Sequence, residues 1–183
     1  NGGKCTTEED FYQACRAAAI LGTLQAGYTD FKFISETSKK IFDREALLGV
    51  SITGWMNNPD ILFDEKILKK GASIVKKVNK EVASIIGINA AARTTCVKPS
   101  GNASVLLQTA SGIHAEHSPM YIRNVQMNKE SEITQAISRT NPFMVEDSVW
   151  SAGGTDVVVS FPIVPKTGSL FKDNLYGVKH LEL

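Results

Sequence analysis

One run of the chain has the residue types and spacing of a phosphate-binding loop. Its members are Lys98, Pro99, Ser100, Gly101, Asn102, Ala103 and Ser104. The proline restricts one backbone angle, and the glycine has no Cβ to block close approach. Amide groups at the start of a helix have no intrahelical partner, so they and the helix dipole favour an anion. Two serine hydroxyls add donors and the lysine adds positive charge, although an ordinary strand–turn–helix joint is the alternative.

Cysteines and histidines are the other candidates for chemistry. Cys5 follows a glycine-rich start and Lys4, and a loop position beside a lysine would favour a thiolate, with an incidental small residue equally open. We expect Cys15, on an apolar helix face, and Cys96, in a strand, to be packed core thiols. The spacing of the three cysteines forms no zinc or disulfide framework.

A metal site is not predicted. His114 and His117 flank Glu116, but Gly112 and Pro119 favour a loop there, and no third ligand is identifiable.

The bulk composition excludes several classes of protein. The 183 residues are 43% hydrophobic, which is enough for the core of one domain, and the net charge is +1. There is no basic run for nucleic acid or a membrane surface, no segment of membrane-spanning length and no signal peptide pattern. An odd number of cysteines without a secretion signal suits a reducing cytoplasm. The chain begins without Met and stops within an amphipathic run, so we expect residues 1–183 to be a single partial domain of a longer protein.

Hydrophobic periodicity predicts alternating helices and strands. Helices are expected over 7–26, 35–42, 64–86 and 129–140, and extended segments over 28–33, 47–54, 92–97, 121–127 and 155–162. A capping box at Thr6 or Thr7 starts the first helix, and Gly27 stops it. The predicted inner face of that helix includes Cys15 and Leu21, and that of 64–86 includes Ile67 and Ile85. This alternation favours an α/β layer or barrel segment.

The phosphate-loop candidate continues into further motifs, Ser111-Gly112-Ile113-His114 and Tyr121-Ile122-Arg123. The stretch from Thr95 to Val125 resembles the substrate-phosphate segment of ribonucleotide reductase large chains. It looks most like the adenosylcobalamin-dependent class, whose pattern is Lys-Pro-Ser-Gly-Thr, a Leu-rich run, Ser-x-Gly-x-His and Tyr-x-Arg. Asn102 departs from the usual Thr, and we expect the change to be tolerated because such loops bind phosphate largely through backbone amides.

The resemblance also covers the run from Gly49 to Trp55, which is similar to the family's Gly-Val-x-x-Thr-Gly strand. It implies that Gly49, Gly54 and His114 shape the pocket, with strand packing as the alternative role of the glycines. In the family, a radical-carrying cysteine lies in Asn-Pro-Cys-x-Glu, and a reductant cysteine follows eleven positions later. Cys5 matches that reductant in context, which would place the radical cysteine before Asn1.

The fold and activity implied are those of the whole family. We expect an α/β fold that is the C-terminal portion of the ten-stranded reductase barrel, in an enzyme that reduces ribonucleotides by a thiyl-radical mechanism. The full enzyme would use adenosylcobalamin, whose site is not identifiable here, and a thioredoxin-like or dithiol reductant. The isolated chain would be inactive and, with strand edges unpaired, prone to self-association. The resemblance leaves open whether the reductase is of the cobalamin-dependent or the iron-dependent class, and whether its substrate is a diphosphate or a triphosphate. The alternative function is a non-catalytic phosphate- or nucleotide-binding module.

Overall fold

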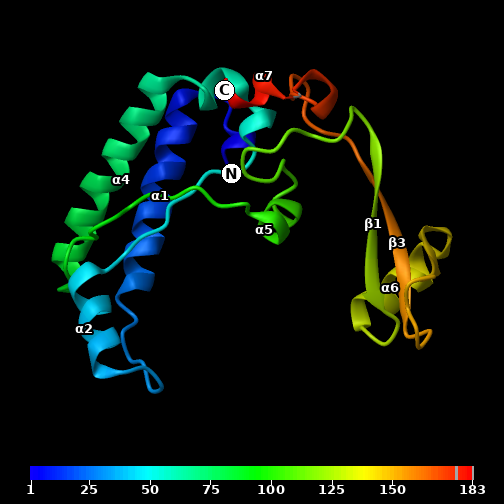
Figure 1. Ribbon diagram of the computed structural model, residues 1–183, viewed down its shortest axis with the longest axis horizontal. Coiled ribbons are helices and arrows are strands. Elements are labelled where there is room, and N and C mark those ends of the chain that lie inside the picture. The colour runs from blue at the N-terminus through cyan, green and yellow to red at the C-terminus, as the bar shows by residue number, and fades with distance from the viewer. Residues whose placement is uncertain (176, 183) are drawn as a thin grey trace. The chain divides into compact units, whose positions relative to one another are not determined.

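The computed structural model describes residues 1–175 and 177–182, with the backbone alone for Asn102 (Figure 1). The chain divides into two compact units, one of residues 1–116 and 166–183 and the other of residues 117–165. The structure mixes helices with a small sheet, and the prediction of a single partial domain stays a prediction. No helix in the described part of the chain is long and apolar enough to cross a membrane.

Two long helices, α1 (Glu8–Ala26) and α4 (Glu65–Ile86), lie side by side in the first unit (Figure 1). The predicted capping box is present: Thr7 Oγ1 accepts the Asp10 N–H at 3.1 Å, and the Asp10 carboxylate accepts the Thr7 N–H at 2.9 Å. Asp64 caps α4 by accepting the N–H groups of Lys66 and Ile67. These local signals confirm both predicted helices.

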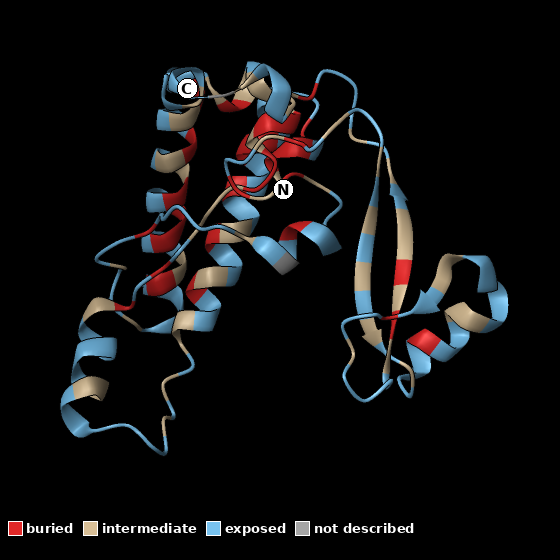
Figure 2. Cartoon of the chain, turned by 45° about the vertical axis from the view of Figure 1, so that its right-hand side comes forward, coloured by how far each residue is buried: buried red, intermediate tan, exposed pale blue. Residues whose placement is uncertain are grey.

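The core of this unit lies between the two helices and the segments around them (Figure 2). Its buried members are Cys5, Phe11, Tyr12, Cys15, Ala19, Leu62, Ile67, Val75 and Val78. Gly71 permits the close approach of α4 to α1, because a Cβ there would lie 2.7 Å from the Phe11 ring.

The predicted helix faces are wrong at Leu21 and Ile85. Leu21 is 68% exposed and Ile85 is 81% exposed. Each lies two residues beyond a buried alanine, Ala19 or Ala83, and two residues turn a helix by about 200°. The buried alanines show that small residues share the contact between the helices with the larger apolar side chains of the core.

Shorter elements complete the first unit. They are η1 (Gly2–Lys4), α2 (Glu36–Glu45), η2 (Trp55–Asn57), α3 (Pro59–Leu62), α5 (Gly101–Leu106), η4 (Lys172–Asn174) and α7 (Val178–Leu181). The predicted helix at 35–42 corresponds to α2, and Ser35 caps it by accepting the Ser38 N–H at 3.1 Å. Residues 28–33 form no strand, and the last residue of the predicted C-terminal amphipathic run, Leu183, lies outside the described residues.

The segments 47–54 and 92–97 run side by side but are not full strands. One parallel bridge joins Val50 to Thr95, and Leu48 N–H and Val50 N–H donate to the carbonyl oxygens of Arg93 and Thr94 at 3.0 Å. The parallel direction agrees with the α/β expectation, although the pairing covers few residues.

The second unit is built on an antiparallel sheet of order β1-β3-β2. Its strands are β1 (Tyr121–Asn128), β2 (Val145–Asp147) and β3 (Asp156–Ile163), accompanied by α6 (Glu132–Thr140) and η3 (Pro142–Met144). Val125 pairs with Val159, which is fully buried. The predicted strands at 121–127 and 155–162 are confirmed, but no parallel pair occurs in this described sheet.

Candidate phosphate site and its surroundings

Hydrogen bonds join the two motif segments of the predicted phosphate site. Ser100 Oγ accepts the Gly112 N–H at 2.8 Å, and Ser111 Oγ donates to the Pro99 carbonyl oxygen at 2.8 Å. Gly112 has φ of 52°, and a Cβ there would lie 2.8 Å from the Lys98 carbonyl oxygen. Only glycine fits this approach without strain. The two hydrogen bonds join the Lys98–Gly101 segment and the Ser111-Gly112 segment into one connected loop.

The loop leads directly into the short helix α5. Ser100 adopts a left-handed conformation with φ of 52°, and its carbonyl oxygen accepts the Ser104 N–H at 2.8 Å. The amides from Gly101 to Ala103 are in the first turn, where N–H groups have no intrahelical partner. Ser100 Oγ is the acceptor in its bond to Gly112, which leaves its own proton for a ligand.

The Ser104 hydroxyl, which the sequence predicts as a donor to phosphate, is not available for that role. Ser104 is buried, and its hydroxyl donates to the Gly101 carbonyl oxygen at 2.6 Å. Its Oγ also lies 3.2 Å from Ser111 Oγ. The Ser104 hydroxyl therefore stabilises the loop instead of pointing to a ligand, whereas the side chain of Lys98 is exposed.

His114 lies beside the same loop. Its Nδ1 is 2.8 Å from the Ser111 carbonyl oxygen, which also accepts the His114 N–H, and its side chain is exposed. His117 belongs to the other unit. Among the described residues there is no group of three His, Cys, Asp or Glu side chains that could hold a metal ion.

A cleft of about 410 Å³ opens next to the loop. It is lined by Ala18, Leu21, Gly22, Gln25, Gly49, Val50, Ser51, Thr53, Lys98, Ser100 and Ala103. Gly49 is thus at the cleft, and a Cβ on it would lie 3.1 Å from Cys96 Sγ. Gly54 is not among these residues; it has φ of 75° and lets Gly3 approach closely.

Thr53, the threonine of the Gly-Val-x-x-Thr-Gly run, also lines this cleft, although the sequence did not mark it as a site residue. It is 7% exposed, and its Oγ1 has no hydrogen-bond partner among the described residues. The motif from Gly49 to Trp55 indicated a role for its glycines. It could not indicate Thr53, because whether a hydroxyl is hydrogen-bonded cannot be read from a sequence.

The Cys5 loop is held tightly next to this region. Asn58 Nδ2 donates to the carbonyl oxygens of Gly2 and Cys5, both at 3.1 Å, and Gly2 N–H donates to the Thr53 carbonyl oxygen. Cys5 Sγ is buried, 3.7 Å from the Asn1 carbonyl oxygen. Burial raises the pKa of the Cys5 thiol, so the expectation that Lys4 favours a thiolate is wrong.

Asn57 is a second residue that sequence reasoning missed. Its Oδ1 accepts from Thr109 Oγ1 at 2.8 Å and from the Ala110 N–H at 2.6 Å. Its Nδ2 donates to Glu116 Oε1 at 2.8 Å and to Ser169 Oγ at 2.9 Å. A single buried amide thereby anchors the segment that leads to Ser111 and Gly112.

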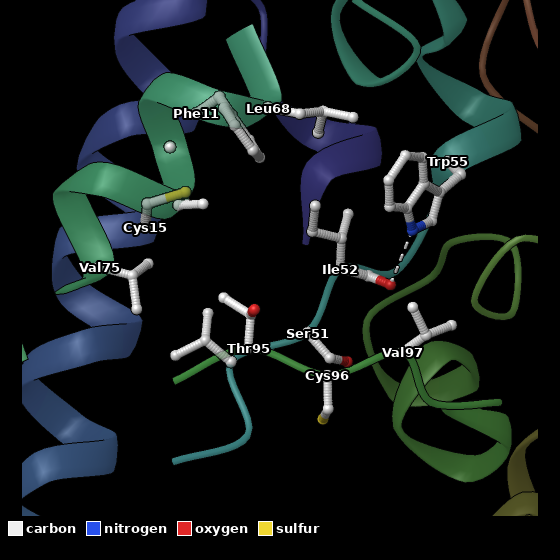
Figure 3. Close-up of a pocket in the computed structure, with 13 residues that line it drawn as sticks. Phe11, Cys15, Ser51, Ile52, Trp55, Leu68, Val75, Thr95, Cys96 and Val97 are labelled. Atoms are coloured by element: carbon white, nitrogen blue, oxygen red, sulfur yellow. Dashed lines mark hydrogen bonds between the residues drawn. The ribbon is translucent and has the colours of Figure 1, made fainter. Parts of the chain in front are cut away.

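A separate cleft of about 340 Å³, shown in Figure 3, is mostly apolar. Phe11, Cys15, Ile52 and Trp55 line it, and the indole N–H of Trp55 donates to the Ile52 carbonyl oxygen at 3.2 Å. Burial raises the pKa of Cys15 to about 11, as befits a core thiol.

Cys96, which also lines this apolar cleft, is exposed, so the prediction that it is a core thiol is wrong. Its side chain points away from Phe11 and Cys15 in Figure 3. The residue against its sulfur is Gly49, which has no side chain to cover the thiol.

No cobalamin site is identified among the described residues. Three clefts among them measure about 340 to 510 Å³. Each of these three is too small for a corrin ring with its nucleotide tail, so no step is assigned to this cofactor here.

Comparison with known proteins agrees with the motifs. No protein-family model matches the chain. In sequence the chain is 28% identical over 161 residues to a probable adenosylcobalamin-dependent ribonucleoside-triphosphate reductase of Dictyostelium discoideum. The aligned region covers 85% of this chain and 20% of the relative. In fold it is similar to a crystal structure of a B-12 dependent (class II) ribonucleotide reductase, with a TM-score of 0.63 and 19% identity, over 88% of the chain and 25% of that structure.

The chain spans only about a fifth to a quarter of the length of these two proteins. The resemblance inferred from the motifs is confirmed, and the chain is similar in sequence and in fold to a segment of adenosylcobalamin-dependent ribonucleotide reductases.

Proposed function

We propose that this chain is part of the catalytic chain of an adenosylcobalamin-dependent ribonucleotide reductase and binds the substrate's phosphate group at residues 98–104. The observation that carries the proposal is the hydrogen-bonded junction between Pro99-Ser100 and Ser111-Gly112. Two motifs that the family uses at its phosphate site are brought into one loop, with Lys98 exposed beside it.

The whole protein would reduce ribonucleotides to deoxyribonucleotides in a ten-stranded α/β barrel of which this chain forms a portion. The relative from Dictyostelium discoideum is named as a ribonucleoside-triphosphate reductase, which favours a triphosphate as the first substrate to test. Ribonucleotide and a thioredoxin-like or dithiol reductant would be its partners, and a reducing cytoplasm suits its free thiols.

In this proposal Cys5 is one of the two reductant cysteines. The geometry supports this role less well than the phosphate role, because the thiol is buried and its pKa is raised. None of the three cysteines lies in an Asn-Pro-Cys-x-Glu motif, so the isolated chain should form no deoxyribonucleotide. The burial of Cys5 is also the observation that favours the alternative, a non-catalytic nucleotide-binding module.

Exposed apolar side chains support the proposal that the isolated chain associates with itself. Phe33 is 97% exposed and Trp150 is 84% exposed, and such groups on a protein surface favour association.

The phosphate proposal is tested with Lys98→Gln. Calorimetry on the 183-residue chain at low salt should show cytidine triphosphate binding that weakens about tenfold in the variant, because a charge-assisted contact is lost. Lys76→Gln, on the solvated face of α4, makes the same change in net charge and should bind as the wild type does. Equal weakening by both variants, or no binding by the wild type, would count against the site.

A further inference from the structure

The strand β1 forms an open edge of the sheet in the second unit. Successive residues of an antiparallel strand point their backbone N–H and carbonyl groups alternately toward the partner strand and away from it. Lys129 N–H, just after β1, donates to the Thr155 carbonyl oxygen at 2.9 Å, so the odd-numbered residues of β1 face β3. The backbone groups of Ile122, Asn124 and Gln126 therefore point to the free edge.

These outward backbone groups have no partner within the described part of the chain. No hydrogen bond there involves the N–H or carbonyl groups of the three residues, and β3 is the one strand paired with β1. The open stretch ends at Asn128, whose carbonyl oxygen accepts the Ser131 N–H at 3.2 Å.

The two edges of the sheet differ in how they are protected. Native edge strands are commonly blocked by shortness, by charge or by proline. At the other edge, β2 is three residues long with exposed Glu146 and Asp147, and Pro162 of β3 has no N–H to offer on that side. By contrast β1, beside β3 in Figure 1, spans eight residues in regular register, with no proline or lysine and with Arg123 as its single charge. The edge of β1 is therefore a template for another strand.

The residue pattern of this edge is complementary to itself. A two-fold axis through the sheet keeps each face on its own side, so outward residues pair with outward residues. An axis at Asn124 pairs that residue with its own copy, and Ile122 with Gln126 of the second copy. It also sets Arg123 against Val125, whereas an axis one residue earlier would set arginine against arginine. With a net charge of +1, two copies repel each other little.

We propose that two copies of this chain pair antiparallel along β1, with Asn124 on the two-fold axis, and join their three-stranded sheets into one. Each outward residue pair then exchanges both of its backbone hydrogen bonds. A strand pair buries a small area, so the dimer is weak and depends on concentration. The inference rests on the self-association proposed above, gives it a defined interface and does not involve the phosphate site.

The test is analytical ultracentrifugation and hydrogen exchange of the 183-residue chain over about a hundredfold range of concentration. Asn124→Pro removes the N–H at the centre of the pairing and no bond of the β1–β3 ladder. Asn124→Ala is the matched control, because it loses the same side-chain bond from Ser160 Oγ, 3.0 Å long, and keeps the N–H. Asn124→Asp keeps that acceptor and sets two negative charges opposite each other.

We expect the dissociation constant of the dimer to rise at least about tenfold in Asn124→Pro and about fivefold in Asn124→Asp at low salt, with Asn124→Ala within about threefold of the wild type. High salt should restore pairing by the aspartate variant. In the wild type, exchange at the Ile122, Asn124 and Gln126 amides should slow as the concentration rises, while exchange at the Arg123 and Val125 amides stays constant.

Two results would overturn the inference and leave self-association standing. One is a dimer that Asn124→Asp and a folded Asn124→Pro both leave unchanged, with exchange at the three outward amides independent of concentration. The other is a dimer lost in Trp150→Ser but not in these variants, which would place the contact at exposed apolar side chains. If melting shows that Asn124→Pro is unfolded, the aspartate variant and the exchange rates decide. A chain that stays monomeric throughout would refute the inference and the proposed self-association together.

Discussion

Buried threonine hydroxyls are hydrogen-bonded in one region of the molecule and unpaired in another. The first region is the helix pair α1–α4, and the second is the loop assembly of residues 53–58 and 98–114. Thr23, between the helices, both donates and accepts a hydrogen bond. Thr53, in the loop assembly, has an unpaired hydroxyl at a cleft. A region built only for stability satisfies its polar groups, and departures from that rule tend to occur at functional sites.

The two regions also differ in what holds them together. The helix pair buries apolar side chains along complementary faces, with small residues at the contact. The loop assembly has few buried apolar groups and depends on backbone contacts and on the Asn57 amide. We therefore expect the helices to set the stability of the first unit and the loops to set its ligand binding.

The largest effect on stability should come from the helix pair. Ile67→Ala removes a side chain that is 7% exposed in the core and should lower the free energy of unfolding by about 2–4 kcal/mol. Ile85→Ala, on the same helix but 81% exposed, should change it by less than about 0.5 kcal/mol. Urea unfolding measures both, and similar losses in the two variants would contradict the burial described for α4.

A smaller loss is expected in the loop assembly. Asn57→Ala removes four hydrogen bonds and should cost about 2 kcal/mol, with faster hydrogen exchange at the Ala110 amide. Asn89→Ala, which removes one exposed bond to the Asp43 carbonyl oxygen, is the control and should have little effect. An Ala110 amide equally protected in both variants would show that Asn57 does not anchor the loop.

The reaction rates of the three cysteine thiols also distinguish the packed core from exposed segments, and their measurement does not depend on a change in stability. Cys96 should react with iodoacetamide at least about tenfold faster than Cys5 or Cys15, because it alone of the three is exposed. The raised thiol pKa of Cys15, about 11, means that little thiolate exists at neutral pH, so its reaction should accelerate as the pH rises. Mass spectrometry of the modified sites checks this order. Rapid modification of Cys5 at neutral pH would contradict its burial and strengthen its assignment as a reductant.

The sequence was most informative where local signals agree with each other. A capping box, apolar periodicity and Gly27 predicted α1, and apolar periodicity predicted α4. The predicted extended segments at 121–127 and 155–162 correspond to β1 and β3. The predicted phosphate loop is likewise a local motif, and its junction with Ser111-Gly112 is present.

Features that depend on distant residues were not predictable in the same way. Asn57 bonds to residues 52 to 112 positions away, so nothing in its own segment marks it. Cys96 is exposed although it lies in a strand-like segment, because exposure depends on which parts of the chain pack around a side chain. The segments 47–54 and 92–97 have strand-like composition, yet their pairing depends on each other and covers few residues.

The central claim, that residues 98–104 bind a nucleotide's phosphate, is tested most directly by nuclear magnetic resonance of the isotopically labelled chain during titration with cytidine triphosphate. The account predicts the largest shifts at the amides of Gly101, Ala103 and Gly112, with none along the solvated face of α4. Shifts confined to another region, or none at saturating nucleotide, would contradict it.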